Sequence, residues 1–217
     1  MSWELHNNIN AFGDVCELNN IYCSTMQVMK ELEQFENDWK KFNSGKPRIL
    51  RDGLSVTSLH GELDGPDLDS LKDLYERTGN SYTELDFATL TDVYHKCPEL
   101  QKVINPWKPW LARCHFLRLP QGGHFPHHLD GGRNPPPDVF RIIVPIQNCV
   151  PPNFFMMIKS GANFESIPFK YGMSTFVNTT KRHVLFNANS KDSIMLIPDV
   201  FFIVFSIYSG LHCTSID

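Results

Sequence analysis

The sequence predicts a mainly β protein of the α+β class, in which a jelly-roll-like core follows a helical N-terminal flank. From about residue 111, short runs rich in β-branched and aromatic residues recur roughly every ten residues, separated by Gly, Pro, Asn and Asp. Before that point, apolar residues recur mostly at three- and four-residue steps. We therefore expect one domain over residues 1–217, with a mostly helical flank (1–110) that buttresses a β core (111–217).

Helical patterns occupy three segments of the flank, and one alternating segment bounded by glycine predicts a strand. The helices are expected at 24–43, 65–79 and 97–107, and the strand at 53–61. Ser24 or Thr25 can cap the first helix. Pro66 in the first turn and Gly79 as the stop delimit the second helix, and Pro98 begins the third.

The strands expected in the core are 111–119, 139–147, 153–160, 165–170, 173–178, 183–188, 193–197 and 201–208. The most apolar stretch, 193–211, is divided by Pro198 and Asp199 into runs of about five and nine residues, whereas about twenty are needed to cross a bilayer. We expect two buried strands joined by a Pro-Asp turn there, and no membrane span.

Composition and charge narrow the classes of partner. The net charge of −4, the pI near 6.1 and the lack of a long basic run argue against nucleic acid. The N-terminus shows no signal-peptide pattern. The six cysteines are scattered without a CxxC pair, so we expect reduced thiols and a cytoplasmic location.

The stretch "QGGHFPHHLDGGRNPPP" (121–137) holds residues that can bind a metal. His128 and Asp130 stand at positions i and i+2, which lie on the same side of an extended chain. A further histidine, His183, lies 55 residues downstream between two apolar strands. Two histidines and one carboxylate on one face of a metal are typical of non-haem Fe(II) sites with open positions.

The region 111–199 resembles a family of double-stranded β-helix dioxygenases. Gly172, Asn178 and His183 match a Gly-x5-Asp/Asn-x4-His pattern of Fe(II)- and 2-oxoglutarate-dependent oxygenases, in particular the branch of aspartyl/asparaginyl β-hydroxylases and small proline hydroxylases. The segment "PHHLD" (126–130) resembles the Pro-His-x-Asp of that branch with one residue inserted. The run "FRIIVPIQN" (140–148) resembles its next strand.

The resemblance implies an enzyme that binds Fe(II), 2-oxoglutarate and O2. It assigns His128, Asp130 and His183 as the metal ligands and catalytic residues. It also implies hydroxylation of a small molecule, such as an amino acid, or of a protein side chain. The sequence does not indicate which substrate is used, and it leaves the oligomeric state open.

The expected 2-oxoglutarate contacts depart from the family pattern. In this branch an arginine usually stands ten residues after the second histidine and binds the distal carboxylate, but here that position is Ser193. We expect Arg141 to take over this role, with Lys191 in support, because strand parity can place Lys191 on the side of Ser193. Ile143 replaces a histidine that some relatives carry near the cosubstrate.

Several alternatives stay open. His127 can replace His128 as a ligand, although a shift by one residue points it to the opposite face of a strand. A zinc hydrolase built on His124, His128 and Asp130 leaves His183 without a role. The chain can also be a non-catalytic, cupin-like metal-binding or sensor module, because the arginine is missing. Residues 131–137, rich in glycine and proline, are a candidate lid.

Overall fold

The computed structural model describes residues 13–46, 49–63, 65–130, 140–201 and 213–215. Its helices are α2 (Thr25–Leu32), α3 (Leu71–Thr78), α4 (Asp92–Lys96) and α5 (Pro98–Ile104), with the 3-10 segments η1 (Glu33–Asp38), η2 (Pro66–Leu68), η3 (Glu84–Phe87) and η4 (Lys108–Trp110). Its strands are β1 (Val15–Tyr22), β2 (Lys40–Lys41), β3 (Asp52–Ser55), β4 (Thr57–Ser58), β5 (Thr89–Leu90), β6 (Leu111–Leu119), β7 (His124–His128), β8 (Phe140–Gln147), β9 (Phe154–Ser160), β10 (Asn163–Ser166), β11 (Met173–Val177), β12 (His183–Asn187), β13 (Ser193–Val200) and β14 (Cys213–Ser215).

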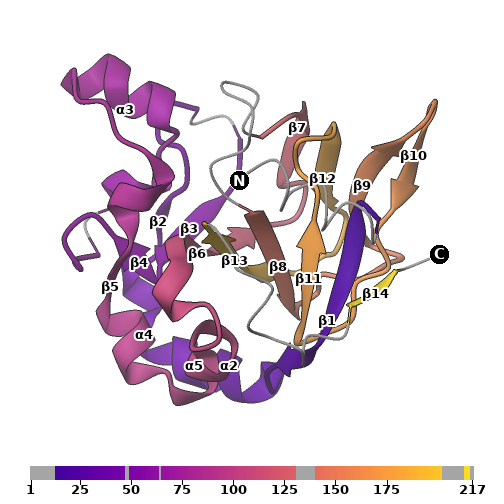
Figure 1. Cartoon of the computed structure of the whole chain (residues 1–217), viewed down its shortest axis with the longest axis horizontal. Helices are drawn as coiled ribbons and strands as arrows, with labels where there is room; N and C mark the ends of the chain where they lie inside the picture. The colour runs from indigo at the N-terminus through magenta and orange to yellow at the C-terminus, as the bar shows by residue number, and fades with distance from the viewer. Residues whose placement is uncertain (1–12, 47–48, 64, 131–139, 202–212, 216–217) are drawn as a thin grey trace.

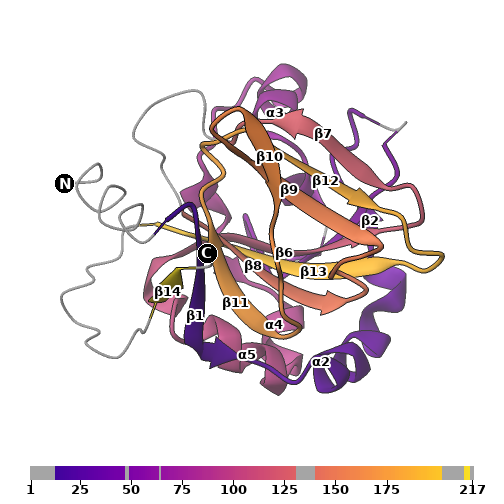
Figure 2. The same ribbon diagram turned by 90° about the vertical axis from the view of Figure 1, so that its right-hand side faces the viewer.

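Twelve of the strands form two facing antiparallel sheets, β4 and β5 form a separate two-stranded sheet, and helices α2, α4 and α5 cover the outer face of the largest sheet (Figures 1 and 2). The large sheet has the order β14-β1-β11-β8-β13-β6-β3-β2, and the small sheet has the order β10-β9-β12-β7. Strands β6, β8, β11 and β13 lie in the first sheet and β7, β9, β10 and β12 in the second. This arrangement is a double-stranded β-helix, so the predicted fold class is confirmed.

Two apolar cores follow from the alternation of side chains along the strands. On β13, Ile194 and Leu196 pack under the helices, whereas Met195 and Ile197 point between the sheets. Both faces of this central strand are buried, which explains why its sequence is continuously apolar rather than alternating. The space between the sheets is the barrel interior.

The flank supplies strands as well as helices. β1 pairs with β11, and β3 pairs with β6, so both extend the large sheet of the core. The expected strand at 53–61 is present as β3 and β4, whereas β1 was not expected, because its polar sequence "VCELNNIY" lacks clear alternation. The division of the chain at residue 110 stays a prediction.

Most of the predicted helix signals act as expected, but Pro66 begins the 3-10 segment η2, and α3 starts only at Leu71 with Ser70 as its N-cap. The Ser24 side chain accepts from the backbone N–H of Gln27, and Gly79 ends α3 in the left-handed conformation, with φ of 73°. Pro98 stands in the first turn of α5. The first helix is shorter than expected, because α2 passes into η1 at Glu33 and then into β2.

The turn predicted at Pro198–Asp199 is wrong, because β13 continues through both residues. The register shifts between Pro198 and Val200, and a bulge of this kind allows proline, which has no N–H to donate, in a central strand. The second strand predicted here, 201–208, lies almost entirely outside the described residues. In the described part of the chain, no helix has the length and apolar character to cross a membrane.

The cysteines differ in part from the expectation of reduced thiols. Cys23, Cys97, Cys114 and Cys149 are free and buried. Cys16 takes part in a disulfide.

Candidate metal centre

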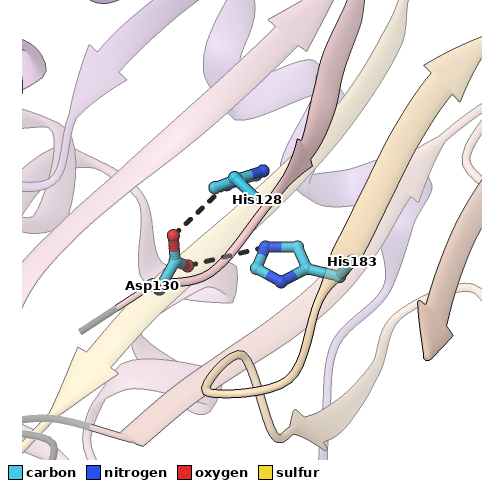
Figure 3. Close-up of side chains that lie close together, drawn as sticks. All are labelled: His128, Asp130 and His183. Carbon is cyan, nitrogen blue, oxygen red and sulfur yellow. Dashed lines mark ion pairs between the residues drawn. The ribbon is translucent and has the colours of Figure 1, made fainter. Parts of the chain in front are cut away.

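Two neighbouring strands of the small sheet bring the predicted triad together. His128 is the last residue of β7, and its Cα partner across the antiparallel pair is His183, the first residue of β12. Asp130 follows two residues after His128, and its backbone N–H donates to the carbonyl of Thr179 at 2.9 Å, which holds the chain beside β12. Figure 3 shows the three side chains pointing toward one another.

The donor atoms are arranged for one ion. One ligand atom from each of His128, Asp130 and His183 lies within 4.8 Å of the other two, and no other such group occurs among the described residues. Nε2 of His128 lies 3.2 Å from Asp130 Oδ1, and Nε2 of His183 lies 3.7 Å from Asp130 Oδ2. Atoms that share one metal at about 2.1 Å each lie roughly 3–4 Å apart, so only small side-chain movements are required.

Backbone carbonyls fix which nitrogen of each imidazole carries the proton. His128 Nδ1 lies 2.8 Å from the carbonyl oxygen of Pro126, and His183 Nδ1 lies 3.0 Å from that of Lys181. A carbonyl oxygen only accepts, so Nδ1 is the donor in both rings, and Nε2 of each ring is the nitrogen that faces Asp130. Metal-binding histidines in proteins are commonly oriented by such a bond from the other ring nitrogen.

A half-buried cation, Arg141, lies directly behind the carboxylate of the triad. Arg141, on the interior face of β8, donates from Nη1 to Asp130 Oδ2. Its Nε donates to Asp199 Oδ1 at 2.8 Å and its Nη2 to Asp199 Oδ2 at 2.7 Å. All three kinds of nitrogen of this guanidinium are therefore engaged with carboxylates, and Asp199, which is fully buried on β13, is bound in a bidentate manner.

These charges set the protonation of the centre. Burial raises the pKa of Asp130, but the Arg141 charge and the histidines outweigh it and hold that pKa well below its usual range. Burial lowers the pKa of His183, and the Asp130 charge opposes this effect only in part. At neutral pH the centre therefore offers a carboxylate and, at His183, a neutral imidazole, the forms that bind a metal.

The other histidines of the motif lie apart from this group. His127 is exposed, and His124 is exposed with its Nδ1 3.1 Å from the carbonyl of Gly122. Neither belongs to the cluster of ligand atoms. The predicted lid, 131–137, lies outside the described residues.

Of the residues expected at the cosubstrate, Arg141 alone touches the triad. Ser193 is buried at the opposite end of β13 from Asp199, and its hydroxyl donates to the carbonyl of Asn148 at 2.6 Å. Lys191 is exposed on the turn before β13. Ile143 is buried in the apolar core between the sheets.

Asp199 was not expected at the centre. A signal for it exists in the sequence, since an aspartate inside the apolar run "SIMLIPDVFF" requires a charged partner if the run is buried. We assigned it to a turn instead, because Pro198 precedes it.

No protein-family model and no curated protein matches the sequence. Solved structures do share its fold. A Trichoplax adhaerens prolyl hydroxylase in complex with a peptide fragment of the hypoxia inducible factor oxygen degradation domain superposes with a TM-score of 0.54 at 11% identity, covering 93% of each chain. A Pseudomonas putida prolyl-4-hydroxylase superposes with a TM-score of 0.51 at 12% identity. The match covers 94% of this chain and 100% of the hydroxylase chain. An alpha-ketoglutarate-dependent epimerase of nogalamycin biosynthesis superposes with a TM-score of 0.52 at 12% identity. The match covers 90% of this chain and 81% of the epimerase chain.

Proposed function

We propose that this chain is an Fe(II)- and 2-oxoglutarate-dependent dioxygenase that hydroxylates a small molecule, such as an amino acid, or a protein side chain. The observation that carries the proposal is the triad of His128, Asp130 and His183. It consists of two imidazoles whose Nε2 atoms face one ionised carboxylate, in a double-stranded β-helix. That ligand set and its open positions suit Fe(II).

When bound, Fe(II) with 2-oxoglutarate and O2 supplies the oxidation, in which a substrate C–H bond becomes C–OH while 2-oxoglutarate loses CO2 to give succinate. The residues of the chain would hold the metal and orient its ligands. Pro126 and Lys181 fix the two imidazole rings through their carbonyls, and Arg141 fixes the carboxylate of Asp130. The Arg141 side chain is 23% exposed, and its guanidinium, bonded to Asp130 and Asp199, lies next to the metal ligands.

We place Arg141, rather than Lys191 or Ser193, at the cosubstrate. The exposed Lys191 and the bonded hydroxyl of Ser193 offer no free cation toward the triad. The branch of aspartyl/asparaginyl β-hydroxylases and small proline hydroxylases is our proposal for the relatives of this chain. The sequence motif around Gly172, Asn178 and His183 supports it.

The proposal is tested by measuring 2-oxoglutarate-dependent succinate formation over a panel of free amino acids and short peptides. His183→Ala and Asp130→Ala should abolish succinate formation while circular dichroism shows the fold retained. His127→Ala is the matched control, because this exposed neighbour lies outside the cluster, and it should leave turnover unchanged. Full turnover in either triad variant, or loss of turnover in His127→Ala alone, would contradict the assignment.

A second candidate, a non-catalytic metal-binding or sensor module, is favoured by one observation. Arg141 is committed to two carboxylates and Ser193 carries no charge, so the usual cation for the distal carboxylate is missing at its family position. Under anoxia, the Fe(II)-loaded protein should gain a weak visible absorption band when 2-oxoglutarate is added if it is the enzyme. If it is the sensor module, the metal binds but no band and no affinity for 2-oxoglutarate are found.

A further inference from the structure

Arg51, immediately before β3, is a buried guanidinium without an ion pair. Arg51 is only 3% exposed, and its Nε has no hydrogen-bond partner. No carboxylate of the described residues lies within ion-pair distance of its guanidinium. The Asn43 amide, oriented to satisfy both neighbours, accepts from Arg51 Nη2 at 3.2 Å and donates to Asp73. Burial lowers the pKa of Arg51 to about 10, so it is charged at neutral pH. A buried charge of this kind requires a counter-ion.

The other arginines of the barrel interior differ from Arg51 in that each has a carboxylate within ion-pair distance, although Nε and Nη2 of Arg113 also make no hydrogen bond. Arg141 is bound by two aspartates. Arg113 lies with Nε 2.7 Å from a carboxylate oxygen of Glu84, and its Nη1 donates to the carbonyl of Asp69 at 2.8 Å. The charges of these two guanidiniums are thus matched within the chain. Among the residues that the structure describes, Arg51 is the interior arginine with no carboxylate within ion-pair distance, and the charge of Asp73 acts on it only from farther away.

The position of Arg51 places this charge beside the metal centre. By strand parity it lies on the same face of the sheet as Gly53 and Ser55, opposite to Leu54 in the helix-covered core. Its Cζ lies 3.9 Å from the ring centroid of Phe125. The Phe125 ring in turn stacks on His128, with centroids 5.8 Å apart. The distance from Arg51 Cζ to the centroid of the His128 ring is therefore at most the sum of these two distances.

We propose that Arg51 is the counter-ion for a carboxylate of a ligand bound at the metal centre. This inference rests on the proposed function, and the carboxylate belongs either to 2-oxoglutarate or to the substrate. The Arg51 guanidinium, whose Nε makes no hydrogen bond, can donate to a carboxylate, and its stacking on Phe125 holds it in place. In either case Arg51 acts in addition to Arg141, whose guanidinium is already bonded to Asp130 and Asp199.

The experiment measures the affinity of matched probes for the Mn(II)-loaded protein under anoxia by calorimetric titration. The first pair is 2-oxoglutarate and 2-oxopentanoate, which has the same keto acid end but no distal carboxylate. The second pair is each free L-amino acid against its carboxamide, added to the protein with 2-oxoglutarate bound. Arg51→Met removes the charge. Arg51→Lys keeps the charge but removes the planar pair of N–H donors that can bind a carboxylate in a bidentate manner.

If the cosubstrate supplies the carboxylate, Arg51→Met should weaken 2-oxoglutarate binding by about 10- to 100-fold, corresponding to one lost charged hydrogen-bonded contact. The same variant should leave 2-oxopentanoate unchanged, and Arg51→Lys should restore part of the loss. If the substrate supplies it, 2-oxoglutarate binding stays unchanged, and Arg51→Met removes the preference for free amino acids over carboxamides. The inference is overturned if wild-type protein shows neither preference, or if Arg51→Met retains both.

Two controls separate this result from a structural effect and from failure of the proposed function. Arg118 also stacks on an aromatic ring, that of Trp39, but it pairs with Glu36 outside the barrel, so Arg118→Met should leave both preferences intact. A midpoint of unfolding lowered equally in both Arg51 variants, without probe selectivity, would contradict the inference. Glutarate, which has both carboxylates but no keto group, should bind wild-type protein and not Arg51→Met even if no keto acid binds the metal.

Discussion

At the metal centre, the fully buried carboxylate of Asp199 determines how the Arg141 guanidinium is held. Arg141 then presents its remaining edge to Asp130. Without Asp199, Asp130 would be the remaining carboxylate partner of Arg141. The guanidinium would then compete with a metal for the oxygen atoms of Asp130. Asp199 is thus a positioning residue that acts through Arg141.

We expect Asp199→Asn to lower the free energy of unfolding by about 3 kcal/mol, because it leaves a buried cation with only one of its two partners. It should also weaken Mn(II) binding. Urea unfolding and a metal titration measure the two effects. Asp192→Asn, on the turn before β13, is the control and should change neither. Unchanged metal affinity in Asp199→Asn would show that Asp199 is structural only.

Gly172, part of the sequence motif, has a backbone role. Its φ is 75°, and a Cβ atom there would overlap the carbonyl oxygen of Cys23. Its N–H donates to the Pro145 carbonyl at 2.8 Å, and its carbonyl accepts from the Cys23 N–H at 3.0 Å. The glycine thus allows the chain between β10 and β11 to approach the end of β1.

Gly172→Ala should therefore destabilise the protein by more than about 2 kcal/mol, since it adds a backbone clash to the cost of a left-handed conformation. Gly79→Ala is the matched control. It has a similar φ of 73° but no atom within 4 Å of an added Cβ, so it should cost only about 1 kcal/mol. Equal losses in thermal or urea unfolding would show that the close approach to Cys23 contributes nothing.

Between elements, helices α2 and α5 cap each other with glutamates. The Glu31 carboxylate, in the last turn of α2, accepts from the backbone N–H of Glu99 at 2.9 Å and of Leu100 at 3.4 Å at the start of α5. The Glu99 carboxylate accepts from the N–H of Ser24 at the start of α2 at 2.7 Å. Each helix start therefore has an acidic partner from the other helix, which favours its positive end.

Glu31→Gln removes the charge but keeps the shape, and we expect it to lower the free energy of unfolding by about 1–2 kcal/mol. Urea unfolding measures the change. The exposed Glu33 on the neighbouring turn has no such role, so Glu33→Gln should lie within about 0.5 kcal/mol of wild type. A loss of the same size in both variants would show that the helix caps are not responsible.

At the scale of the whole molecule, the metal centre joins β7 to β12 near the edge of the small sheet. A metal that binds the folded chain alone stabilises it by about 2.7 kcal/mol at a concentration of 100 times Kd. For a chain of 217 residues this corresponds to a rise of roughly 5–10 °C in Tm. Mn(II) should produce this rise, EDTA should reverse it, and His183→Ala should remove it. A rise that persists in His183→Ala would place the metal elsewhere.

Sequence alone determined the fold class, most strands of the core and the three residues that the structure brings together as a candidate metal site. Turn residues at regular spacing mark where strands end. Side chains alternate along an extended chain, so His128 and Asp130, two residues apart, lie on one side. The resemblance of Gly172, Asn178 and His183 to a known family pattern then implied His183. The strand ends and the side of each residue are local features and therefore can be predicted without contacts.

Tertiary structure alone decided what surrounds the ligands. The pairing of Arg141 with Asp199 joins residues 58 positions apart, and it depends on the register of β8 against β13 through a bulge that no local pattern predicts. The burial of Arg51 without a carboxylate partner likewise appears only when β3 and β7 meet over the barrel interior. Burial and charge pairing depend on distances between distant segments, and only the folded chain sets those distances.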